Sequence, residues 1–239
     1  MTIKATASPR PRIEQLLSDI GRLKGKVQEL EGDYRDTASI SQNAENDLQN
    51  AQWPLRRAES DTPQKDSSFD GQQALQSIHD GQRELERNQR DFSGMQSDSR
   101  QATTDFDKAR RDLASIIQDS NSYPNCQNNL RQASTSLDGA DQDHKRADSE
   151  GDWADNKTNQ ALSDLRWAEM DARNVSYDRP GQDVSSDARQ ASSEVDRAQW
   201  QTRDCSGNLR NANSYEQRSE NGLASVEQQL RQALANLPA

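Results

Sequence analysis

The sequence predicts an all-α fold, an elongated antiparallel four-helix bundle of long heptad-patterned helices in up-down-up-down order, with no β-strand. Alternate steps of three and four residues land mostly on apolar residues, the spacing of a helix with one buried seam. Pro63, Pro124 and Pro180 divide the 239 residues into four segments of similar length. Short polar turn sequences surround these prolines, which favours antiparallel neighbours.

Composition alone is typical of a disordered chain, because only 30% of the residues are hydrophobic and the mean hydropathy is -1.22. The seam argues otherwise. It runs over Ile13 to Ala58, Ala74 to Ile116, Cys126 to Val175 and Val184 to Leu237. Of its 58 positions 47 are apolar, against roughly 17 expected from the composition. Scarce apolar residues are concentrated on one stripe, which favours folded helices.

The first helix is expected over residues 11–60, after an extended tail over residues 1–10 that has no periodicity. Pro11 suits a first helical position. Pro54 interrupts the backbone hydrogen bonds, but the seam keeps its phase beyond it, which indicates a kink and not an end.

The other helices follow turn-forming sequences that contain capping residues. They are expected over 68–118, 125–177 and 183–236, capped by Ser67 or Ser68, by Asn125 and by Asp183. Residues 11–239 are expected to form a single domain. An arrangement of three helices with a fourth donated to a neighbouring chain stays open.

The two ends of such a bundle are expected to differ in stability. Bulky seam residues gather at the end that contains the turn 119–125, and the opposite half relies on alanine, threonine and serine. Each leucine replaced by alanine in a core removes about 2 to 3 kcal/mol. Local opening is therefore expected to begin in the alanine-rich half.

Charge and hydropathy exclude some partners. The net charge of -10 is spread over interspersed signs without a basic face, so no nucleic-acid partner is expected. Apolar runs are too short for a transmembrane segment. No apolar stretch follows Met1, so a cytoplasmic address is the default, while export without a cleaved signal peptide stays open.

Antiparallel stacking brings three polar seam residues, His144, Glu216 and Ser99, to the same level. One interpretation is a metal or acid–base site. However, metal sites in helical bundles need several carboxylates and a Glu-x-x-His spacing, which the chain lacks. The other interpretation is a buried polar layer that determines helix register. We expect the latter, with no cofactor, no metal and no enzymatic activity.

A second polar layer and the two cysteines are also interpreted as structural. The layer combines Asn88, Thr158, Thr202 and Cys205, with Ser41 nearby; a ligand pocket is the alternative. Cys126 and Cys205 fall at levels about 45 Å apart along the predicted bundle, too far for a disulfide within the chain. Free thiols are expected, and a bridge between chains is the alternative.

The tryptophans lie off the seam, although a chain with so few apolar residues would normally bury them. The outward residues are Trp53, Trp153, Trp167, Trp200 and Tyr177, all in the alanine-rich half. Each ring could lie flat on neighbouring arginine and glutamine side chains, or the residues could form a contact patch for another protein. A sugar or aromatic ligand is a third possibility.

Three functions follow from these features. The first is a structural or self-assembling subunit, as in a filament, that contacts copies of itself through the outward aromatic residues. The second is a monomeric adaptor that binds another protein through the same patch. The third is a metal protein or enzyme centred on His144 and Glu216. The first is preferred.

Overall fold

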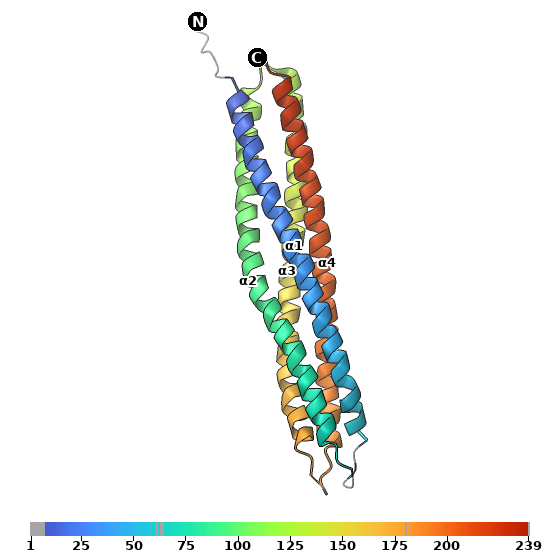
Figure 1. Ribbon diagram of the computed structural model, residues 1–239. Helices are drawn as coiled ribbons and strands as arrows, with labels where there is room; N and C mark the ends of the chain where they lie inside the picture. The colour runs from blue at the N-terminus through green and yellow to red at the C-terminus, as the bar shows by residue number, and fades with distance from the viewer. Residues whose placement is uncertain (1–7, 61, 63–64, 180, 239) are drawn as a thin grey trace. The chain divides into compact units, whose positions relative to one another are not determined.

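The computed structural model describes residues 8–60, 62, 65–179 and 181–238, and these form four α-helices without a strand. The helices are α1 (Arg10–Ala58), α2 (Ser68–Asp119), α3 (Pro124–Ser176) and α4 (Ser185–Ala235), and their ends differ from the expected ones by at most two residues. Each runs antiparallel to the next (Figure 1). The prediction of an all-α up-down bundle is confirmed. Residues 1–7 of the expected tail lie outside the described residues.

The chain divides into two compact units, and every helix contributes a segment to each. Unit 1 contains residues 1–33, 95–149 and 211–239, and unit 2 contains residues 34–94 and 150–210. Unit 1 therefore combines the start of α1, the end of α2, the start of α3 and the end of α4. Unit 2 combines the remaining halves. That residues 11–239 behave as one domain stays a prediction.

In each unit the four helix segments close into a ring of neighbours. Polar contacts in unit 2 join α1 to α2 (Asn88 Nδ2 to Ser41 Oγ, 2.7 Å), α2 to α3 (Gln89 Nε2 to Asn159 Oδ1, 2.7 Å), α3 to α4 (Lys157 Nζ to Asp204 Oδ2, 3.2 Å) and α4 to α1 (Arg203 Nη2 to Glu45 Oε1, 2.6 Å). Unit 1 repeats this order. Helices α1 and α3 are therefore diagonal, and the fourth helix comes from the same chain.

The core is the predicted seam. Every one of its positions, from Ile13 to Leu237, is buried. A period of 3.5 residues keeps one stripe toward the partner helices over the whole length. In unit 2 the main core cluster consists largely of alanine, with Leu48, Leu55, Ile78 and Leu85 among its larger members. Within the described residues, no helix has a stretch long and apolar enough to cross a membrane.

The helix ends agree with the predicted caps at one position and differ at another. Asp183 Oδ1 accepts a hydrogen bond from the backbone nitrogen of Ser185 at 2.9 Å, at the start of α4. Helix α3 begins at Pro124, earlier than expected, so that Asn125 lies in its first turn instead of capping it. Proline is well suited to a first helical position because its missing N–H has no partner there. Helix α1 continues through Pro54.

Candidate functional site

The first candidate is the buried polar layer of unit 1. His144 on α3 and Glu216 on α4 have no exposed side-chain surface, and Nδ1 of the histidine lies 2.8 Å from Oε1 of the glutamate. Nε2 of His144 lies 3.2 Å from the backbone oxygen of Ser99 and 3.3 Å from Oγ1 of Thr103, both on α2. The ring of Phe106 stacks on the imidazole with centroids 5.4 Å apart. Three helices thus meet at one histidine.

The protonation of this layer follows from its partners. A carbonyl oxygen can only accept, so the contact with Ser99 O favours a proton on Nε2, while the carboxylate favours one on Nδ1. Burial disfavours the imidazolium, but the hydrogen bond and charge of Glu216 outweigh it, and the pKa of His144 is raised. Burial likewise raises the pKa of Glu216, although His144 lowers it in part. His144 and Glu216 therefore form a buried, hydrogen-bonded pair.

Ser99, His144 and Glu216 are connected in the order of a hydrolytic triad, but the serine hydroxyl is neither directed at the histidine nor accessible to a substrate. The hydroxyl of Ser99 lies 3.5 Å from Nε2 and donates instead to Oδ1 of Asp148 at 2.7 Å. All three triad residues are fully buried, so a substrate carbonyl cannot reach the hydroxyl. Among the described residues, no group of three or more His, Cys, Asp or Glu side chains is placed to hold a metal ion.

The second polar layer lies in unit 2 around Cys205. Its sulfur lies 3.4 Å from Oγ of Ser41 and 3.3 Å from Oγ1 of Thr158, and Asn88 donates to the same Ser41 hydroxyl. Thr202 instead donates to the carbonyl of Ala198 in its own helix. Burial raises the pKa of the Cys205 thiol, which keeps it protonated and unreactive.

Cys126 and Cys205 are both free and buried, as expected. Burial also raises the pKa of the Cys126 thiol, although a hydrogen bond with Ser120 lowers it in part. A protonated thiol without access to solvent is a poor nucleophile.

The outward aromatic residues all belong to unit 2 and are exposed. Trp153 and Trp167 on α3 expose 58% and 56% of their surface, and Trp200 on α4 exposes 66%. Trp153 and Trp167 occupy heptad position c of α3. This position lies next to the side of α3 that faces α4, where Lys157 pairs with Asp204. Trp153, Trp167 and Trp200 therefore share the outer face of α3 and α4, which we call the α3–α4 face. Tyr177, Phe69 and Met170 are also exposed.

Trp53 differs from the other tryptophans in position and surroundings. It lies on α1, the helix diagonal to α3 in unit 2, so it cannot belong to the α3–α4 face. The guanidinium of Arg57, one turn later, stacks on its ring at 3.7 Å from the centroid. Within the described residues, no cation stacks on Trp153, Trp167 or Trp200.

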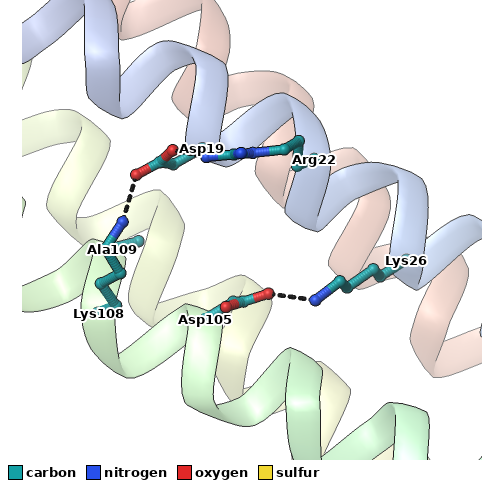
Figure 2. Close-up of a pocket in the computed structure, with 6 residues that line it drawn as sticks. All are labelled: Asp19, Arg22, Lys26, Asp105, Lys108 and Ala109. Carbon is teal, nitrogen blue, oxygen red and sulfur yellow. Dashed lines mark hydrogen bonds and ion pairs between the residues drawn. The ribbon is translucent and has the colours of Figure 1, made fainter.

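A surface recess of unit 1, between α1 and α2, is lined by charged side chains that pair with one another (Figure 2). Lys108 Nζ lies 2.6 Å from Asp19 Oδ2, and Lys26 Nζ lies 2.6 Å from Asp105 Oδ2. Burial raises the pKa of Asp19, but the bonds from Lys108 and Arg22 outweigh it, so that this pKa is lowered. Both carboxylates of the recess are thus paired with cations of the protein, and Arg22 shares Asp19 with Lys108.

Sequence reasoning alone identifies some of these residues and misses others. Thr103 and Asp148 complete the layer of His144; they lie four residues after Ser99 and His144, and this i, i+4 spacing could have found them. The recess between α1 and α2 has no signal in the sequence, because aspartate is frequent in the chain and no spacing shows which charged side chains face each other across two helices. Phe69 and Met170 are apolar residues off the seam, so the rule that singles out the tryptophans could have found them.

The chain was compared with known proteins at the level of both sequence and fold. No protein-family model, no curated protein and no solved structure matches it.

Proposed function

We propose that this protein is a structural, self-associating helical bundle without catalytic activity, and that the α3–α4 face of unit 2 is its association surface. The single observation that supports the proposal most strongly is the exposure of Trp153, Trp167 and Trp200. In a chain with 5% aromatic residues, three tryptophans on one face are a large part of the apolar surface it can offer. Tryptophan is also the residue most enriched in interface hot spots.

The dimensions of the α3–α4 face suit a protein partner. Measured from Trp153 to the exposed Tyr177, which directly follows α3, it extends over about 36 Å at about 1.5 Å per residue. Two helices side by side make it roughly 20 Å wide, which corresponds to about 700 Å². Stable protein interfaces bury about 800 Å² on each partner. A flat two-helix surface of this size favours another protein over a small molecule, which binds in a concave pocket.

The proposed absence of catalytic activity rests on the burial of the polar layer of unit 1. The side chains of His144 and Glu216, whose pKa values are both raised, are sealed from solvent. A general acid or base must come within hydrogen-bonding distance of a substrate atom. Buried groups that bond only to one another act on helix register instead.

The test is the particle mass across a concentration series, measured by sedimentation equilibrium or light scattering. The wild-type chain is expected to form a complex that dissociates on dilution, and Trp200→Ala is expected to weaken it at least 30-fold. Trp53→Ala is the matched control, because that ring lies on another helix under Arg57, and it should leave the mass unchanged. A wild-type chain that stays monomeric at the highest concentrations would rule the proposal out in favour of an adaptor for a different protein.

A further inference from the structure

The register between α3 and α4 places Trp200 close to the midpoint between the two tryptophans of α3. Thr158 Oγ1 lies 3.3 Å from Cys205 Sγ, and Lys157 pairs with Asp204 at 3.2 Å. Counting from these pairs along antiparallel helices puts Trp200 level with residues 161–163 of α3. Trp153 and Trp167 lie about 21 Å apart along α3, and Trp200 falls within about 5 Å of the midpoint between them.

Four charged residues surround that same centre in an alternating pattern. Along α3, Lys157 is followed one heptad later by Asp164; along α4, Arg197 is followed one heptad later by Asp204. The register sets Lys157 level with Asp204, and therefore Asp164 level with Arg197. Each charge thus has the opposite sign next to it both along its own helix and across to the neighbouring helix.

Such a square is complementary to its own copy under a two-fold axis. With the axis across the helices, Lys157 meets Asp164 of the second copy and Arg197 meets Asp204. With the axis along the helices, Lys157 meets Asp204 of the second copy and Asp164 meets Arg197. Two-fold contacts use the same patch on both chains, and a patch of one sign would repel itself. Alternating signs at the centre are what such a contact needs.

From this alternation we infer that the occupant of the α3–α4 face is a second copy of this chain, bound in a two-fold symmetric dimer. The inference rests on the proposed self-association and adds the partner, the surface and the symmetry. The aromatic residues fit the same operation. An axis across the helices sets Trp153 level with Trp167 of the second copy, and an axis along them sets Trp200 level with the exposed, small Ser163.

The charge balance favours a second copy over a charged ligand. The charges of Lys157, Arg197, Asp164 and Asp204 sum to zero, whereas the whole chain has a net charge of -10. Arg197 also pairs with Glu194 of its own helix, but that carboxylate is buried and is not presented on the face. A neutral square lets two acidic chains approach without local repulsion, but it gives a polyanion or a polycation nothing to select.

Reciprocal charge exchanges test the symmetry. Asp164→Arg is the starting change, because it sets like charges opposite under either axis, twice in each dimer. Exposed pairs are individually weak, so the dimer is expected to dissociate about tenfold more readily, at low salt where screening is small. Adding Lys157→Asp restores the pairs only if the axis lies across the helices. Adding Arg197→Asp restores them only if the axis lies along the helices.

The result expected is that one of the two double variants recovers the wild-type dissociation constant and the other weakens it further; either axis supports a two-fold dimer. Far-UV circular dichroism melts confirm that all variants are folded. If the wild type associates and Trp200→Ala disrupts the complex, but neither double variant recovers, the two-fold arrangement is wrong while self-association stands. If the wild type does not associate at all, the proposed function itself fails.

Discussion

Replacing Glu216 by leucine breaks the buried pair of unit 1 and should be among the most destabilising single changes in the chain. His144 then has no acceptor for Nδ1, which now lies 2.8 Å from Glu216 Oε1, and no exposed surface through which water could replace it. Removing one partner of a buried ion pair destabilises a protein by about 3 to 5 kcal/mol, because the other charge stays buried without compensation. His144→Leu should have an effect of similar size, since it leaves the carboxylate unpaired.

The double variant, with leucine at both positions, is expected to recover most of this loss. Desolvation of two charged groups offsets much of their attraction, so apolar replacements of similar volume are often neutral or stabilising by about 1 to 4 kcal/mol. The neighbouring ring of Phe106 already provides an apolar contact on one side. The coupling energy between the two substitutions should therefore be at least about 3 kcal/mol, well above the non-additivity of distant sites.

Urea denaturation followed by far-UV circular dichroism at pH 7 measures all four free energies of unfolding in this cycle. All four tryptophans belong to unit 2, so their fluorescence reports whether a change in unit 1 also affects unit 2. Two single variants with losses below about 1 kcal/mol each, or a double variant whose loss equals their sum, would refute a tightly coupled buried pair.

The same cycle has a defined pH dependence. The raised pKa of His144 means that its stabilisation is complete below the ordinary value of 6.5 and is lost as the pH rises through the folded-state pKa. The raised pKa of Glu216 acts in the same direction above its ordinary value of 4.5. The stability of the wild type relative to the double leucine variant should therefore decline as the pH rises above 4.5, and further above 6.5, as urea midpoints at successive pH values will show.

Three further predictions concern unit 2. Gly71→Ala should destabilise the fold by more than about 1 kcal/mol, because the new Cβ would lie 2.6 Å from the backbone carbonyl carbon of Val175. Gly94→Ala in the same helix meets nothing within 4 Å and should stabilise the fold by about 0.5 to 1 kcal/mol. Thermal melts of the two variants compare these effects. Asp171→Asn should raise the melting temperature at pH 7, because burial, with Asp187 and Glu194, raises the pKa of Asp171; this gain should vanish below the ordinary pKa of 3.8, where the carboxyl becomes neutral in both states. Amide hydrogen exchange should be faster in unit 2 than in unit 1, and equal protection in both would contradict this expectation.

The fold follows from the sequence because one physical rule governs the whole chain. An apolar stripe with a 3.5-residue period must face a partner helix. Turn-forming residues mark where the chain reverses, and one of them, Asp183, caps the next helix. The differences of one or two residues at helix ends, such as the start of α3 at Pro124, arise because several residues in a turn sequence can provide the first helical position.

The candidate site was predictable only in part, because it depends on which helices are neighbours. The heptad positions predict that Trp53, Trp153, Trp167 and Trp200 all point outward, and all four are exposed. They cannot show that α1 is diagonal to α3, which separates Trp53 from the others. Similarly, the i, i+4 spacing places Asp148 beside His144 on α3, but only the pairing of α2 with α3 shows that Asp148 accepts a hydrogen bond from Ser99.

The buried layers and the outer face are connected through helix register. A stripe of alanine tolerates sliding, because one alanine replaces another at every heptad. Thr158 and Cys205 have one matching level, at which their side chains are 3.3 Å apart. If α4 slipped by one heptad, Trp200 would move by about 10 Å, and Lys157 would stand level with Arg197 in place of Asp204. The polar residues inside unit 2 thereby determine whether charges of opposite sign alternate on its surface, on which the proposed association depends.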